Sequence, residues 1–470
     1  MNDLTFQSAT WLAAAIRRKD LSSREVIEAH LEQIERANPP LNAVVHVLAQ
    51  TAREAARKAD DAVARGDSLP PFHGVPMTVK DAWEVAGVPS TGGTLGRKSY
   101  IPERDATVIA RMRAAGAIPI GMTNLPEFSF AFESDNLLHG RTNNPYNLSR
   151  TPGGSGGGGA AAIAAGMSPI EIGADLGGSI RLPSHFSGIA GIRPTTGRVP
   201  MTGYFPPSIG WVSHFSAAGP MARTVEDLAV ALPLISGPDW IDSAAQDVPL
   251  RDWRAVSVKG LRVAVHTDNR IMPARADIAR TVMEAAKSLA DAGAIVEQAI
   301  PTGIEQCLGI FTGIANADAG ESVRMLLANV GTLRTHALLD GALNMSREPR
   351  SAAFLQGMWA QVDMYRSAML SFLRNYDLIL SPVNALPAIE HGTCFREDIF
   401  PGFSYTAAHN LTGWPGAVVR CGTSTEGLPI GVQAVARPWR EDVALAVTQH
   451  LETAFGGYQR PALAVAVETT

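Results

Sequence analysis

Two patterns alternate along the chain: stretches with the apolar period of a helix, and short runs of consecutive apolar residues. The helical pattern is clearest after Ser22, which forms a capping box with Glu25, and we expect this helix to end near residues 38–40. A second helix is expected over residues 43–65, because Gly66 is a typical residue to follow a helix. The same reasoning predicts helices at 106–115, after Gly159, at 224–234, at 276–292, through much of 303–375, and at 441–455.

The short apolar runs between these helices predict buried strands. They lie at residues 74–81, 117–121, 170–174, 261–266, 294–296, 377–381 and 416–420, and the first delivers Lys80 at its end. Strands that alternate with helices are typical of an α/β fold with a largely parallel or mixed sheet. Because the chain has no internal repeat and no low-complexity linker, we expect one large domain.

Composition limits the class of protein without changing this prediction. The 470 residues are 46% hydrophobic and 18% charged, as in an ordinary globular protein, and the net charge is −5. No basic block is present, so nucleic acid and anionic membranes are poor candidates for partners. The amino terminus lacks a secretory pattern and the chain has no apolar run of about 18 residues, so we expect a cytoplasmic protein without a membrane span.

Cysteines and histidines give no indication of a metal site. Cys307, Cys394 and Cys421 are far apart in sequence and form no C-x-x-C pair, which favours buried thiols in a reducing compartment. The 11 histidines show neither H-x-H nor H-E-x-x-H spacing. We therefore expect no metal and no other cofactor.

The most distinctive segment is the glycine-rich stretch at residues 152–183, for which three interpretations compete. Gly154, Gly156 and Gly159 fit the G-x-G-x-x-G dinucleotide fingerprint, and residues 153–157 fit the G-x-S-x-G nucleophile elbow. Both motifs must follow a strand, whereas Ser149-Arg150-Thr151-Pro152 precedes them, so both are disfavoured. The third interpretation assigns the chemistry to two serines.

Ser155 and Ser179 each follow a pair of glycines. One predicted helix and one predicted strand separate them, which allows the two loops to fold back together. Glycines next to Ser179 leave backbone N–H groups uncovered, and such groups can stabilise an oxyanion. The candidate donors are the N–H groups of Leu176, Gly177, Gly178 and Ser179.

A serine nucleophile also needs a base. His185 is the nearest histidine, but it follows Pro183 in a different context, and Lys80 at the end of a predicted strand is the alternative. A lysine side chain has an ordinary pKa of about 10.4, so a lysine serves as a base only where its site favours the neutral form.

These residues belong to a longer series of short motifs. The series comprises Gly74-Val75-Pro76 through Lys80-Asp81, Gly121-Met122-Thr123-Asn124 with Glu127-Phe128, Asn144-Pro145, Gly153-Gly154-Ser155, residues 173–183, Gly188-Ile189-Ala190-Gly191, Arg193-Pro194-Thr195, Gly219-Pro220-Met221-Ala222-Arg223, Leu411-Thr412-Gly413-Trp414-Pro415 and Gly427-Leu428-Pro429-Ile430-Gly431-Val432-Gln433. In their order and spacing, from about residue 20 to 455, these motifs resemble the amidase signature family.

The resemblance implies a fold and an activity. The fold would be a single amidase domain over residues 1–470, with a central mixed, mostly parallel β-sheet surrounded by helices and a signature core at about 70–225. The activity would be cofactor-independent hydrolysis of a small-molecule carboxylic amide, giving the acid and ammonia or an amine. The alternatives are the glutaminase subunit of a tRNA-dependent amidotransferase and a non-catalytic family member; a homodimer is left open.

Carried over to this chain, the resemblance implies a Ser–Ser–Lys triad. Ser179 matches the nucleophile, Ser155 matches the bridging serine that follows a cis peptide bond, and Lys80 matches the base. Neutral Lys80 would take a proton from Ser155, which would take one from Ser179 during its attack on the amide carbonyl. An acyl-enzyme and its hydrolysis by water would follow.

The chain departs from the family pattern at Gly156, where the family usually has a second serine that helps to orient the relay. Asp175 and Arg181 are expected to brace the nucleophile loop. Ser129, Phe130 and Gly154 are expected substrate contacts, although core packing is an equal alternative for Ser129 and Phe130. The sequence Gly203-Tyr204-Phe205-Pro206-Pro207 suggests an apolar wall and thus aryl or medium-length aliphatic amides.

Overall fold

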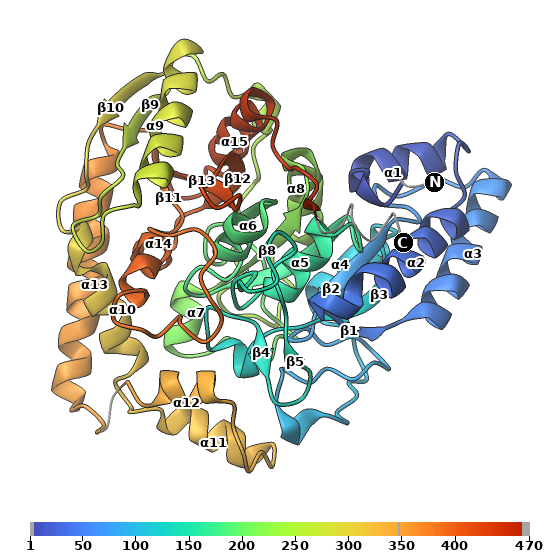
Figure 1. Cartoon of the computed structure of the whole chain (residues 1–470), viewed down its shortest axis with the longest axis horizontal. Coiled ribbons are helices and arrows are strands. Elements are labelled where there is room, and N and C mark those ends of the chain that lie inside the picture. Colours follow the sequence, from blue (N-terminus) through green and yellow to red (C-terminus); the bar gives the residue numbers. More distant parts are fainter. Residues whose placement is uncertain (1–3, 346–347, 463–470) are drawn as a thin grey trace.

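The computed structural model describes residues 4–345 and 348–462, and helices surround its central sheet (Figure 1). In this part of the chain 11 strands form one sheet. In spatial order the strands are β1 (Val44–Val47), β3 (Ile118–Thr123), β2 (Pro76–Lys80), β6 (Ile170–Asp175), β8 (Ala217–Ala222), β7 (Ala190–Arg193), β12 (Gly416–Thr423), β13 (Pro429–Ala436), β11 (Leu378–Pro382), β9 (Arg262–Val265) and β10 (Ile295–Gln298). The predicted mixed α/β sheet in a single domain is confirmed.

Parallel pairing is confined to two groups of strands. Strands β3, β2 and β6 are parallel to one another, and so are β11, β9 and β10. The other six of the ten neighbouring pairs are antiparallel, so the sheet is less parallel than expected. A short turn joins β12 to β13, and strands joined without a crossover must run antiparallel. Continuous apolar runs do not distinguish the two directions in a buried sheet.

Helices cover both faces of the sheet. The larger core cluster joins one face to α1 (Ala9–Arg17), α4 (Thr107–Ala114), α8 (Val225–Ile235), α9 (Ala276–Asp291) and α15 (Glu441–Phe455). Met77 and Val79 of β2 belong to this cluster, and because side chains alternate along a strand, Lys80 projects to the opposite face. There α5 (Gly157–Ala164) and α6 (Arg181–Ser187) pack against the strands.

Local signals predicted several elements correctly. The capping box of Ser22 and Glu25 opens α2 (Ser23–Leu41), which continues through Pro39 and Pro40 to Leu41. Helix α15 has the predicted bounds. The predicted helix over 43–65 is wrong at its start, because the β-branched run from Val44 forms β1 and pairs with β3; the helix is α3 (Ala49–Arg65).

Besides β1, three strands of the 11-stranded sheet were not predicted: β7, β8 and β13. Strand β8 contains Gly219 and Pro220, residues that weaken a strand signal. The predicted helical character of 303–375 is confirmed by α10 (Cys307–Ala315), α11 (Glu321–Asn329), α12 (Ala337–Leu343) and α13 (Ala352–Leu373). Figure 1 shows α11 and α12 together at the lower edge of the molecule, with α9, β9 and β10 at one end and α1 to α3 at the other.

Candidate active site

The predicted catalytic residues and the bracing Asp175 lie together at the carboxyl ends of neighbouring strands. Lys80 is the last residue of β2 and Asp175 the last of β6, and these strands are parallel neighbours, so their carboxyl ends meet. Ser155 lies just before α5, and Ser179 lies between β6 and α6. All four side chains are buried; Ser179 has 7% of its surface exposed and Lys80 none.

Lys80 and Ser155 are in direct contact. The Lys80 Nζ donates to Ser155 Oγ over 2.7 Å and to the hydroxyl of Tyr204 over 3.1 Å. The peptide bond between Gly154 and Ser155 is cis. The Gly156 N–H donates to the Ser179 carbonyl oxygen over 3.2 Å, which ties the two serine loops together. Within the described residues, the Ser179 hydroxyl has no hydrogen-bond partner, and it faces the same cavity as Ser155.

Asp175 holds the loop that carries Ser179. One carboxylate oxygen accepts from the Gly178 N–H over 2.9 Å, and the other accepts from the Ile180 N–H over 3.2 Å. Both oxygens also accept from the Arg181 guanidinium at 3.0 Å. The predicted bracing by Asp175 and Arg181 is therefore visible in the contacts.

This bracing changes the set of free N–H groups beside Ser179. The Gly178 N–H is occupied by Asp175. In the part of the chain that the structure describes, the N–H groups of Leu176, Gly177 and Ser179 make no hydrogen bond. Three of the four predicted oxyanion donors thus remain available, and the fourth holds the loop in shape.

Electrostatics favour an ionised Asp175 at this site. Burial alone would raise the pKa of its carboxyl, but the Arg181 guanidinium, the nearby Arg193 and hydrogen bonds from Arg181 and Asn410 hold that pKa well below its usual range. Glu171, also buried on β6, differs: burial raises its pKa to about 7, although hydrogen bonds and the charge of Lys80 oppose this.

A cavity of about 540 Å³ opens above the two serines. Of the expected substrate contacts, Ser129 and Phe130 line it, whereas Gly154 packs against the backbone of Glu133. The walls are mainly aromatic and aliphatic: Phe132 stacks on Phe403 with ring centroids 4.0 Å apart, and the other aromatic lining residues are Phe128, Phe130, Tyr204, Trp211, Phe311, Phe395 and Phe400. Among the lining residues that the structure describes, Asp318 is the one carboxylate, and no lysine or arginine occurs.

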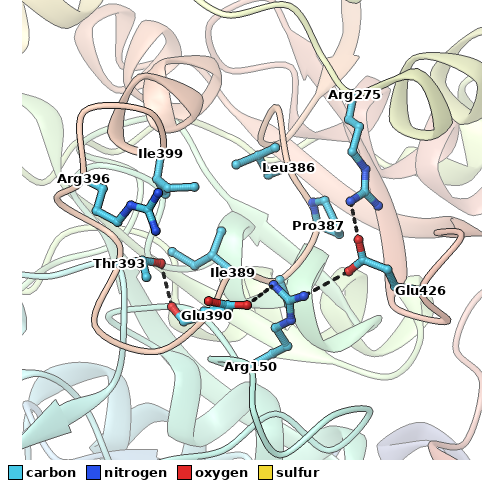
Figure 2. A pocket seen from close by; sticks show the side chains of 11 residues that line it. Arg150, Arg275, Leu386, Pro387, Ile389, Glu390, Thr393, Arg396, Ile399 and Glu426 are labelled. Atoms are coloured by element: carbon cyan, nitrogen blue, oxygen red, sulfur yellow. Dashed lines mark hydrogen bonds and ion pairs between the residues drawn. The ribbon is translucent and has the colours of Figure 1, made fainter.

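A second cavity, of about 250 Å³, lies elsewhere and contains none of the predicted catalytic residues. Figure 2 shows Arg150 between Glu390 and Glu426, with Arg275 reaching Glu426 from the other side. The pairs are 3.9, 3.3 and 2.7 Å apart. Because these carboxylates already pair with Arg150 and Arg275, we place the candidate site at the serine cavity.

Neither a metal-binding cluster nor a membrane-spanning helix occurs in the described residues. Within 4–345 and 348–462, no group of three or more His, Cys, Asp or Glu side chains could hold a metal ion. No helix in those ranges is long and apolar enough to cross a membrane. Cys307, Cys394 and Cys421 are free and buried, as predicted.

Comparison with known proteins identifies the family. The family model described as Amidase matches residues 25–445, which include every residue of the site discussed above. The chain belongs to the amidase family.

The similar proteins include amide hydrolases and a subunit of an amidotransferase. The chain is 35% identical to an indoleacetamide hydrolase of Bradyrhizobium diazoefficiens, over 96% of this chain and 86% of that protein. It is 30% identical to a subunit of the glutamyl-tRNA(Gln) amidotransferase of Carboxydothermus hydrogenoformans, over 96% of this chain and 97% of that protein. Among solved structures, a bacterial aryl acylamidase superposes with a TM-score of 0.86 at 26% identity, covering 98% of each chain.

Amidase-family motifs led directly to Lys80, Ser155 and Ser179, but not to two contacts of the site. The sequence placed Tyr204 in an apolar wall, whereas its hydroxyl contacts Lys80. The occupied N–H of Gly178 was also missed. The tyrosine hydroxyl was the available signal for the first contact, but the two residues lie 124 positions apart.

The structure explains the glycine at position 156. A Cβ added there would lie 2.7 Å from the Ser179 carbonyl oxygen and 3.3 Å from Met221 Cε. We expect the added methyl group of Gly156→Ala to push the two serine loops apart. Such overpacking lowers the free energy of unfolding by about 1–3 kcal/mol. The melting temperature and the turnover rate of the purified variant should both fall.

Gly357→Ala is the matched control for this prediction. Gly357 lies within α13, and an added Cβ would meet nothing within 4 Å. Alanine is the better helix former, so this variant should be at least as stable as the wild type. Unchanged melting and turnover for Gly156→Ala would show that the loops have more room than the structure gives them.

Proposed function

We propose that the protein is a free-standing amidohydrolase that cleaves a carboxylic amide through Ser179, Ser155 and Lys80. The observation that carries the proposal is the 2.7 Å contact between Lys80 and Ser155, beside the cavity that Ser179 also lines. Among the described residues the Ser179 hydroxyl has no hydrogen-bond partner, so it is available to a substrate. A serine hydroxyl is a weak nucleophile without a base, and a buried lysine amine can supply that base through a second hydroxyl.

The first half of the reaction forms an acyl-enzyme. Neutral Lys80 accepts the Ser155 proton while Ser155 accepts the Ser179 proton, and the Ser179 oxygen bonds to the amide carbonyl carbon. The carbonyl oxygen becomes an oxyanion, which the N–H groups of Leu176, Gly177 and Ser179, without partners among the described residues, would stabilise. The relay returns the proton to the amide nitrogen, the C–N bond breaks, and ammonia or an amine leaves.

Water completes the cycle. The relay removes a proton from a water molecule as that water attacks the ester carbonyl of the acyl-enzyme. The second tetrahedral intermediate collapses with cleavage of the bond to the Ser179 oxygen, which regains its proton. The products are a carboxylic acid and the free enzyme.

The lining of the cavity favours an uncharged, apolar substrate. Its aromatic and aliphatic walls would bury an aryl or medium-length aliphatic group, and such burial contributes about 25 cal/mol per Å² of apolar surface. Two relatives named for amides of this kind, an indoleacetamide hydrolase and an aryl acylamidase, are consistent with that choice.

The alternative is a glutaminase subunit of an amidotransferase, since relatives are named as amidotransferase subunits. Free glutamine bears an α-ammonium and an α-carboxylate, and burying such charges requires partners. Asp318, the one carboxylate in the described lining, already accepts the N–H groups of Gly320 and Ser322. This observation favours the free-standing hydrolase; a homodimer and a cytoplasmic location stay predictions.

A substrate panel tests the proposal with the purified chain alone. We expect aryl and medium-length aliphatic amides to be hydrolysed with kcat/KM at least about 100-fold above that for glutamine, because unpaired charge is strongly disfavoured in an apolar pocket. Released ammonia, amine and acid are quantified, with heat-denatured protein as the blank. Activity that appears only on glutamine and only with an added partner subunit would favour the alternative.

A further inference from the structure

Tyr204 joins the proposed base to the wall of the cavity. Its hydroxyl lies 3.1 Å from Lys80 Nζ and 3.0 Å from Ser129 Oγ. We propose that Tyr204 is a positioning residue for Lys80: its hydroxyl accepts one N–H of the amine and thereby directs the amine's lone pair at Ser155. This inference rests on the proposed function, in which Lys80 is the base.

The loop that carries Tyr204 is fastened to the residues that follow Lys80. The Glu84 N–H donates to the Gly203 carbonyl over 2.9 Å, and the Phe205 N–H donates to the Ala82 carbonyl over 2.8 Å. The Tyr204 ring packs edge-on against Trp83, with centroids 4.7 Å apart. Because the segment directly after β2 holds this loop, the phenol and the amine keep a fixed relation to each other.

The hydrogen-bonding capacity of a neutral amine explains why such a partner matters. A neutral lysine has two N–H donors and one lone pair, and it serves as a base only through that lone pair. When Tyr204 accepts one N–H, rotation about the last side-chain bond is restricted. The lone pair can then meet the Ser155 hydroxyl. The Ser129 hydroxyl lies within hydrogen-bond distance of the Tyr204 oxygen, and either group can donate. In the proposed arrangement Tyr204 donates its proton to Ser129, which leaves its oxygen available to Lys80.

Position 156, where the family usually has a serine, offers Lys80 no hydroxyl in this chain, and the Tyr204 hydroxyl is a partner for the amine instead. Gly156 has no side chain, and the Ser179 carbonyl oxygen would stand 2.7 Å from a Cβ added there. No hydroxyl can therefore reach Lys80 from Gly156 without a shift of the backbone. Ser155 and Tyr204 are the hydrogen-bond partners of Lys80 in the described chain.

The test is a double-mutant cycle on Tyr204 and Lys80. Tyr204→Phe removes the hydroxyl and keeps the ring against Trp83. We expect kcat to fall about 10- to 100-fold, the range for a lost hydrogen bond to a charged or reacting group, with KM within about twofold. The rate at which a fluorophosphonate modifies Ser179 should fall by a similar factor.

In the background of Lys80→Ala, the same Tyr204→Phe change should lower the modification rate by less than about twofold. The amine that Tyr204 is proposed to orient is absent in that background. Tyr365→Phe is the control: Tyr365 is buried, donates to the Ala408 carbonyl and is not among the residues that line the cavity, so its loss should lower the melting temperature and leave kcat unchanged. Rescue of Tyr204→Phe is not expected from Gly156→Ser, since that Cβ has no room.

Failure of this inference is distinguishable from failure of the proposed function. Wild-type protein that hydrolyses amides and is modified at Ser179, combined with an unaffected Tyr204→Phe variant, overturns the inference alone. An equal loss in both lysine backgrounds also overturns it, because Tyr204 would then act independently of Lys80. Modification of the wild type at a residue other than Ser179 overturns the proposed function itself.

Discussion

Replacing Ser179 with alanine is expected to abolish amide hydrolysis, with a fall in kcat of at least about 10⁴-fold. The variant lacks the oxygen that would bond to the carbonyl carbon, and removal of a nucleophile costs nearly all of the acceleration that its triad provides. The N–H groups beside it would remain, so a small residual rate over water is consistent with the proposal. Rates are measured on the best amide of the panel.

Covalent labelling gives the second readout for this variant. A fluorophosphonate should add one adduct mass to the wild type, located at Ser179 by peptide mapping, and none to Ser179→Ala. Ser184→Ala is the matched control, because Ser184 is also buried in this segment but donates to the Ile180 carbonyl and lies outside the cavity lining. An adduct retained by Ser179→Ala would place the nucleophile elsewhere.

Elements determined by nearby residues were predicted from the sequence, whereas some elements that depend on pairing with distant strands were not. The capping box at Ser22 and the helix from Glu441 to Phe455 depend on residues within a few positions, and both are found. Strand β1 depends on a partner, β3, that lies more than 70 residues away. The sequence prediction therefore assigned its short β-branched run to the helix that follows. The antiparallel centre of the sheet likewise depends on pairing between distant strands.

The candidate site divides in the same way. Lys80, Ser155 and Ser179 stand in motifs whose order could be recognised, and the structure brings their loops together. The contact of Tyr204 with Lys80 arises from the way one loop is fastened beside Trp83, which no short pattern encodes. The hydrogen bond from the Gly178 N–H to Asp175 depends on the folded shape of the loop, which decides which of several neighbouring N–H groups meets the carboxylate. The sequence does not show this.

Asp175→Asn is expected to destabilise the protein by about 3–5 kcal/mol, the usual cost of leaving one partner of a buried ion pair without the other. Asp175, Arg181 and Arg193 have no exposed side-chain surface, so water cannot solvate the two guanidinium groups when the carboxylate is lost. Melting temperature and the urea midpoint measure the change. Turnover should fall as well, because the charged acceptor of the Gly178 N–H disappears.

The exposed pair of Arg53 and Glu28 is the control, since it has similar geometry at 2.6 Å but remains in water. Glu28→Gln should change the melting temperature little, because water screens such pairs. The low pKa of Asp175 fixes the pH dependence: its contribution is complete above the unfolded-state pKa of about 4 and is lost as the pH falls through the lower folded-state value. The difference between wild type and Asp175→Asn should therefore be constant at neutral pH and narrow below about pH 4. Equal stability at neutral pH would mean that Arg181 does not need this carboxylate.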